Sequence, residues 1–332
     1  MPWHSALNVP DSLPANSPET SSPQAIPGTS SGPAATPPVR PLSFIFTRSG
    51  EFRAVWRLLF FFAVAFTVGF VLVVGGRFTL ATSGVLPTRY SVQFLFSLII
   101  PVALLVAHAT SLYAFDRRGW DFVALDEAAC TTRAIGLGAA LGALAIGVPT
   151  LILLGLHQFA IYPAVGGSFI GATVRTTAFL IPAALWEELL FRGYPFAVLR
   201  QAIGWKGALI ATSVVFGLAH ILNGGADPQN IIIVTTAGFF LGMVLLATRS
   251  LYAAWAAHFA WNWVMACAFH VNVSGSPFER PVYEMVAKGP AWVTGGVWGP
   301  EGGVGAAIGL FVVVFYVYGR YLKPGGEQST HG

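Results

Sequence analysis

Charged residues are scarce in this chain of 332 residues: Asp, Glu, Lys and Arg make up 10% of it, whereas hydrophobic residues make up 55%. An ordinary soluble domain carries about a quarter charged residues. The deficit excludes a soluble globular protein and predicts a protein integral to a membrane. The formal net charge of +4 comes without a basic run or a basic patch interleaved with aromatic residues, so no nucleic-acid partner is expected.

Cysteine and the common hydrolase motifs are also missing or nearly so. The two cysteines, Cys130 and Cys267, fall in a predicted cytoplasmic loop and near the outer end of a predicted span. Neither a disulfide framework nor a cysteine metal site is therefore expected. The chain lacks the HExxH motif of helix-borne zinc sites, and no predicted span carries a GxSxG motif or a serine–lysine pair.

Long apolar runs are what the sequence has instead. About 20 apolar residues cross the hydrocarbon layer as a helix. The runs predict an all-α polytopic transmembrane helix bundle with about eight spans. The spans are expected at Val55–Gly75, Val92–Leu112, Ala134–Leu156, Thr173–Phe191, Ala208–Leu222, Ile231–Ala247, Leu251–Phe269 and Val304–Tyr318.

The distribution of basic residues predicts the orientation of these spans. Short cytoplasmic loops are enriched in Lys and Arg, and most basic residues of this chain fall on one side if both termini are cytoplasmic. The opposite loops, 157–172 and 223–230, carry neither residue. We therefore expect a multi-pass protein of a bacterial inner membrane, in contact with membrane lipids, with both termini in the cytoplasm.

Composition also divides the chain into regions. Residues 1–43 are rich in Pro and Ser and predict a disordered cytoplasmic tail. Residues 44–323 form the predicted transmembrane domain, and 324–332 a short C-terminal tail. The glycine-rich segment 271–303 contains four prolines that prevent a continuous helix, and it is expected to lie outside the membrane, where it could cap the outer face.

Two adjacent acids, Glu187 and Glu188, interrupt the apolar run Thr177–Phe191. A carboxylate at the centre of a span costs about 2.5–3.5 kcal/mol on insertion scales, so it needs compensation. Arg192 lies one helical turn from Glu188 and predicts an ion pair with it. Glu187 points about 100° away without an obvious cation, which suits a general acid or base. The alternative is an ion-pair network that only joins helices.

Two histidines and an amide on other predicted spans are the candidate partners of Glu187. His220 ends the fifth span, and His258 and Asn262 lie one turn apart on the seventh. Together these groups supply a base, imidazoles and a neutral hydrogen-bond donor, the set that acyl hydrolysis by water requires. At about 1.5 Å per residue, however, Glu187 and His258 lie about 10–12 Å deep and His220 about 20 Å, so their convergence needs a tilted or late-starting helix.

These motifs resemble, in order and spacing, those of the CAAX protease and bacteriocin-processing family, also called CPBP or Abi. The matching residues are Glu187-Glu188-Leu-Leu-Phe-Arg192 for EExxxR, Phe216-Gly-Leu-Ala-His220 for FxxxH and His258-Phe-Ala-Trp-Asn262 for HxxxN. The resemblance covers a motif core at residues 181–262. It implies an eight-helix intramembrane peptidase in which Glu187 activates water with His220, while His258 and Asn262 form the oxyanion pocket and Glu188 and Arg192 support them.

The same resemblance leaves metal dependence open, since such proteins are often called metalloproteases. Glu187, His220 and His258 could supply three ligands to a catalytic zinc or another divalent metal. A glutamate that binds the metal cannot also be the free base, so we favour a glutamate mechanism without a cofactor. The implied substrate is a membrane-associated peptide or protein.

Two other functions compete with this hypothesis. A proton- or ion-coupled transporter also uses intramembrane Glu and His residues, although no second pair of intramembrane acids mirrors Glu187 and Glu188. A non-catalytic immunity or scaffold membrane protein of the same fold would keep the motif residues without turnover.

Overall fold

A computed structural model describes residues 47–48, 51–82, 89–164 and 166–322. The tails predicted at residues 1–43 and 324–332 lie outside the described residues. The chain divides into two units, Met1–Arg53 and Ala54–Gly332. In the first unit, β1 (Thr47–Arg48) pairs with β2 (Glu51–Phe52) as an antiparallel hairpin.

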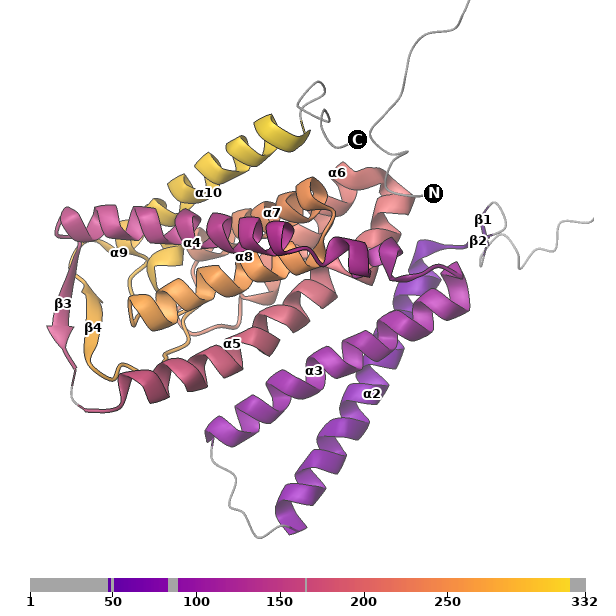
Figure 1. Ribbon diagram of the computed structural model, residues 1–332, viewed down its shortest axis with the longest axis horizontal. Coiled ribbons are helices and arrows are strands. Elements are labelled where there is room, and N and C mark those ends of the chain that lie inside the picture. Colours follow the sequence, from indigo (N-terminus) through magenta and orange to yellow (C-terminus); the bar gives the residue numbers. More distant parts are fainter. Residues whose placement is uncertain (1–46, 49–50, 83–88, 165, 323–332) are drawn as a thin grey trace, which may run out of the picture. The chain divides into compact units, whose positions relative to one another are not determined.

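The second unit is a bundle of helices (Figure 1). Each of the eight spans predicted from the sequence coincides with a helix of this unit, and the predicted all-α polytopic bundle is confirmed. α8, with 13 residues, is in none of the candidate membrane spans among the described residues. α8 continues through the π-helical turn η5 (Val264–Ala268). The helices are α2 (Ala54–Thr82), α3 (Arg89–Ser111), α4 (Thr132–Gly155), α5 (Phe169–Arg192), α6 (Tyr194–Ala219), α7 (Pro228–Thr248), α8 (Leu251–Trp263) and α10 (Val304–Val317).

The surface of these helices is apolar enough to face lipid. Among the described residues, six candidate membrane spans satisfy the length and composition of a transmembrane helix, and one of them, Phe169–Ala219, covers both α5 and α6. Phe66 and Phe78 on α2 are 75% and 70% exposed, and a soluble protein rarely exposes a continuous apolar surface of this kind. The protein is therefore an integral, multi-pass membrane protein.

α6 differs from the prediction, because it begins at Tyr194 rather than at Ala208. The backbone N–H of Tyr194 donates to His108 Nε2 at 2.9 Å, which satisfies one of the free donors at the helix start. The helix then breaks at Gly204, whose φ of 76° suits a residue without a Cβ. Arg200 and Lys206 interrupt the apolar run here, so the sequence pattern indicated a loop.

A buried polar network joins the start of α6 to α2. Arg57 forms an ion pair with Asp116, and the two side chains are only 6% and 5% exposed. Arg57 Nη1 donates to Gln201 Oε1 at 2.9 Å, and the Tyr194 hydroxyl donates to Asp116 Oδ2 at 2.8 Å. Arg57 is thus a packed residue of the helical unit.

Two segments expected to be loops contain a strand each. β3 (Phe159–Pro163) pairs antiparallel with β4 (Tyr283–Ala287), with Phe159 opposite Ala287 and Pro163 opposite Tyr283. The second segment also contains the short helices α9 (Ala291–Thr294) and η6 (Pro300–Gly302). The helices α5, α6, α7 and α8 lie between the two strands in the sequence, so no local sequence pattern predicts that the strands pair.

Small residues allow the closest helix contacts in the bundle. An added Cβ on Gly138 would come within 2.1 Å of the Ala253 carbonyl oxygen, and one on Gly142 within 2.0 Å of the Ala257 carbonyl oxygen, so α4 lies directly against α8. Gly238 of α7 similarly approaches Ser213 of α6. Gly238 thus lets α7 pack closely on α6, and the α4 pair does the same for the helix that carries His258.

The α4–α8 contact predicts a steric effect that depends on position. Gly142→Ala forces α4 away from the Ala257 backbone, and we expect it to lower the free energy of unfolding by about 1–3 kcal/mol, as overpacking does. Gly136→Ala is the matched control, because an added Cβ there meets nothing within 4 Å. Unfolding of the detergent-solubilised proteins gives the free energy of unfolding of each variant. Equal values for Gly142→Ala and Gly136→Ala would show that stability does not require the close approach of α4 to α8.

Candidate active site

α8 is held at its start and along its side, and this fixes where its polar residues lie. Ser250 Oγ accepts the backbone N–H of Ala253 at 3.2 Å and donates to the Ala129 carbonyl at 2.6 Å. Such a cap satisfies a free donor at the helix start. Trp255 Nε1 donates to the Ile181 carbonyl of α5 at 2.9 Å. α8 is therefore anchored alongside α5, the helix that carries both glutamates.

Glu188 and Arg192 form a fully buried ion pair on α5. Arg192 Nη1 donates to Glu188 Oε1 at 3.1 Å, and neither side chain is exposed at all. Arg192 Nη2 donates to the Gly238 carbonyl of α7 at 3.0 Å, and its guanidinium lies 4.3 Å from the centre of the Phe216 ring on α6. The pair thus joins three helices, and the spacing of one helical turn predicted it.

His258 lies between the two glutamates. Its Nδ1 is 2.8 Å from Glu188 Oε1, and its Nε2 is 3.8 Å from Glu187 Oε2. Because an ionised carboxylate only accepts hydrogen bonds, Nδ1 must carry the proton of the shorter contact. Glu188 therefore fixes the orientation of the imidazole and leaves Nε2 for Glu187 and its surroundings.

Glu187 is the less constrained of the two acids. Its side chain is 19% exposed, and its Oε2 has no hydrogen-bond partner among the described residues. With both carboxylates ionised and Arg192 charged, the three side chains carry one net negative charge. A carboxylate with an open lone pair beside an imidazole can accept or return a proton.

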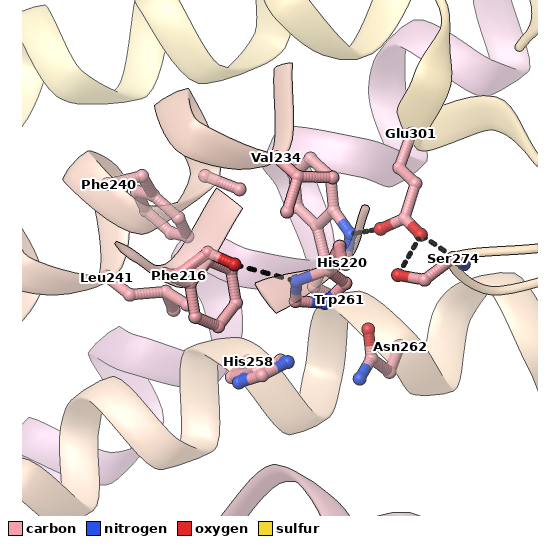
Figure 2. Close-up of a pocket in the computed structure, with 11 residues that line it drawn as sticks. Phe216, His220, Val234, Phe240, Leu241, His258, Trp261, Asn262, Ser274 and Glu301 are labelled. Atoms are coloured by element: carbon pink, nitrogen blue, oxygen red, sulfur yellow. Dashed lines mark hydrogen bonds between the residues drawn. The ribbon is translucent and has the colours of Figure 1, made fainter. Parts of the chain in front are cut away.

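His220, His258 and Asn262 line a single pocket (Figure 2). His220 is the residue at which α6 ends, and its Nδ1 is 2.8 Å from the Phe216 carbonyl, so its Nε2 is the nitrogen left for other partners. The Phe216 ring lies 4.9 Å from the His220 ring and 5.9 Å from the His258 ring. Three predicted site residues on two helices thus meet at one place.

The pocket is small where it is enclosed and wider where it opens. About 20 Å³ is free for the centre of a water molecule, and about 360 Å³ is free of protein atoms when the open part is included. The first volume holds about one water. Glu187 and Glu188 are not among the lining residues; they contact His258, which is.

The expected difference in depth does not keep His220 from His258. Counting residues gives depth only for helices that start at one level and run parallel to the membrane normal. α6 instead starts at Tyr194 and breaks at Gly204. Its last turn consequently reaches the same pocket as the middle of α8.

Three polar or hydrogen-bonding residues of the pocket were not predicted from the sequence: Trp261, Ser274 and Glu301. Trp261 Nε1 donates to Glu301 Oε2 at 2.8 Å, and Ser274 Oγ donates to Glu301 Oε1 at 2.8 Å. Glu301 lies in Gly299-Pro-Glu-Gly-Gly303, outside every apolar run, so the pattern of acids within predicted spans does not include it. Its position directly before the last span was the available signal.

The alternative metal ligands are not gathered into a binding cluster. Among the described residues, no group of three or more His, Cys, Asp or Glu side chains is arranged to hold a metal ion. Glu187, His220 and His258 therefore do not form a ready three-ligand site in this arrangement.

Comparison with known proteins gives one positive result. Residues 168–264 match the model of a family described as Rce1-like, type II CAAX prenyl endopeptidase Rce1-like. The match confirms the resemblance to CAAX proteases and spans α5, α6, α7 and α8 with all the motif residues. Ser274 and Glu301 lie outside it. No curated protein and no solved structure matched the chain.

The buried ion pair predicts unequal effects of one substitution at the two ends of α5. Arg192→Met leaves the Glu188 carboxylate buried without its cation, and we expect a loss of about 3–5 kcal/mol in the free energy of unfolding. Arg175→Met removes an arginine whose pair with Glu279 is 62% and 29% exposed, and we expect about 0–1 kcal/mol. Denaturant titration of the detergent-solubilised protein compares them; similar losses would contradict the stabilising role of the buried pair.

Proposed function

We propose that this protein is a CAAX-type intramembrane endopeptidase, starting from the similarity of residues 168–264 to type II CAAX prenyl endopeptidases. It would hydrolyse a peptide bond of a membrane-associated peptide or protein. The observation that carries the proposal is the meeting of His220, His258 and Asn262 at one pocket, with Glu187 Oε2 3.8 Å from His258 Nε2.

In the proposed reaction, a water molecule in the pocket attacks the carbonyl carbon of the substrate. Glu187 does not line the pocket but lies 3.8 Å from Nε2 of the lining residue His258, so the attacking water must lie at the His258 side, where Glu187 accepts its proton. His220 assists through Nε2, since its Nδ1 is occupied by the Phe216 carbonyl. A C–O bond forms while the carbonyl double bond becomes an oxyanion. The enclosed part of the pocket has room for about one water, which supports this nucleophile.

His258 and Asn262 are the proposed donors to the oxyanion, with His258 donating from Nε2 in its doubly protonated form, because its Nδ1 already donates to Glu188. Donors arranged in advance stabilise the developing charge without reorganisation, and losing one such donor typically lowers kcat by about 100- to 1,000-fold. Glu188 holds His258 Nδ1 at 2.8 Å, so it is a positioning residue in this scheme. Arg192 positions Glu188 in turn.

The tetrahedral intermediate then collapses. The C–N bond breaks, and the amide nitrogen takes up the proton that Glu187 had accepted. The products are a carboxylic acid and an amine, so the reaction consumes one water and needs no other reactant. Glu187 returns to the carboxylate form and can begin another cycle.

We also propose that both termini lie in the cytoplasm. The absence of Lys and Arg from the loops 157–172 and 223–230 supports this orientation. The loop between α3 and α4 would then be cytoplasmic. Cys130 in this loop is exposed, whereas Cys267 is buried.

The two cysteines allow a test of orientation without adding any. In intact spheroplasts, we expect a membrane-impermeant maleimide to leave Cys130 unlabelled, because the loop faces the cytoplasm, and to label it once the membrane is permeabilised. Cys130→Ser is the control that identifies the labelled site. Labelling of Cys130 before permeabilisation would contradict the proposed orientation.

Activity is tested by reconstituting the full chain with a library of membrane peptides and identifying the products by mass spectrometry. We expect Glu187→Gln and His220→Ala each to lower the rate by at least about 100-fold, since each removes a group that handles the proton. Glu127→Gln and His157→Ala are matched controls at exposed positions. They should retain the wild-type rate.

The remaining hypotheses predict other outcomes. If every peptide that wild type cleaves is also cleaved by the Glu187→Gln variant, or if wild type cleaves none, the peptidase proposal fails and a scaffold role is favoured. Proton flux in proteoliposomes that vanishes in Glu187→Gln would favour transport. Cleavage that continues in a strong chelator supports the glutamate mechanism, and cleavage that stops and returns with zinc supports the metal-dependent one.

A further inference from the structure

Glu301 is the one acidic residue among those that line the pocket, and the lining contains no Lys or Arg. It lies on η6, directly before α10, and is 5% exposed. Figure 2 shows its carboxylate at the end of the pocket formed by Ser274 and Trp261, with His220 nearby and His258 and Asn262 along α8. A formal negative charge thus lies in the space that holds the proposed catalytic groups.

Neutral donors hold this carboxylate. Oε2 accepts Trp261 Nε1 at 2.8 Å, and Oε1 accepts both the hydroxyl and the backbone N–H of Ser274. Three hydrogen bonds use three of the roughly four acceptor positions of a carboxylate. They keep Glu301 in place without neutralising its charge.

Two other features make the potential in the pocket more negative. α6 ends at the pocket, and the C-terminal end of a helix carries about half a negative charge. The buried group of Glu187, Glu188 and Arg192 adds one net negative charge behind His258 when both carboxylates are ionised and His258 is neutral. The rest of the lining is largely apolar and aromatic, with Phe216, Val234, Ala237, Phe240 and Leu241.

We propose that this pocket selects a substrate with a cationic side chain next to the scissile bond, within an otherwise apolar segment, and rejects an acidic one. Glu301 determines the preference. A cation gains attraction from the carboxylate in a partly desolvated site, whereas a second carboxylate is repelled there. This inference rests on the proposed function, because it names the substrate class of the same site.

Glu301 also has a structural role that must be separated from charge recognition. By binding Trp261 of α8 and Ser274 of the segment after it, Glu301 holds the 271–303 segment against the pocket. Removing it could change activity simply by loosening this contact. The test therefore needs one variant that changes the charge and another that weakens the contact while keeping the charge.

The experiment uses the full chain in nanodiscs of zwitterionic lipid and three fluorescein-labelled peptides of leucine and alanine. The peptides differ in one central residue, which is Lys, norleucine or Glu; norleucine keeps most of the lysine methylene chain without the charge. Kd is measured by fluorescence anisotropy with empty nanodiscs subtracted, and kcat/KM by mass spectrometry. We expect wild type to prefer Lys over norleucine, and norleucine over Glu, by at least about tenfold each in Kd.

Glu301→Gln keeps the shape of the side chain and an acceptor oxygen but removes the charge. We expect the ratio of Lys to norleucine affinity to fall to within about threefold of one. Ser274→Ala removes one hydrogen bond to Glu301 and keeps the carboxylate, so the ratio should stay above about tenfold. The comparison of peptides on wild type needs no variant, which keeps the proposal testable if Glu301→Gln does not fold.

Three results would overturn the proposal: no charge preference in wild type, a preference that persists in Glu301→Gln, or an equal loss of preference in Ser274→Ala. Charge-selective binding without any cleavage would count against the peptidase function and leave the selectivity standing. Cleavage of all three peptides at one rate, with equal Kd values, would count against the selectivity alone.

Discussion

The site depends on the hydrogen bonds of the Glu188 carboxylate, whose side chain has no exposure to solvent. One of its oxygens accepts hydrogen bonds from Arg192 and from His258, and Arg192 extends the contact to the Gly238 carbonyl of α7. A charge buried without partners would cost several kcal/mol. The helices α5, α7 and α8 must therefore meet in this arrangement, and the orientation of His258 follows from it.

Close backbone packing makes this arrangement geometrically accessible. Gly138 and Gly142 bring α4 directly against the alanines that precede His258 on α8, and Gly238 leaves its carbonyl within reach of Arg192. In a membrane, van der Waals contact and interhelical hydrogen bonds drive helix association, because lipid tails are as apolar as the side chains. Small residues at the contacts and a few buried polar groups therefore determine which helices of this bundle contact one another.

The pocket combines parts with different sequence signals. His220, His258 and Asn262 belong to motifs in a stretch similar to known endopeptidases, and the motifs predicted that they lie together, as they do in the lining of one pocket. Ser274 and Glu301 come from the segment after α8, and β4 in that segment pairs with β3 from before α5. Such pairing between segments distant in sequence leaves no local periodicity, so the sequence did not predict that Ser274 and Glu301 line the pocket.

The sequence by itself determined that the chain is a polytopic helical membrane protein, because apolar run length decides which segments cross a bilayer. It also determined the Glu188–Arg192 pair, because residues four apart share a helix face. Only the tertiary structure decided that α6 starts at Tyr194, that His258 lies between the two glutamates, and that Glu301 enters the pocket. These facts depend on where helices tilt, break and touch, and distances across a bundle are set by packing between residues far apart in the chain.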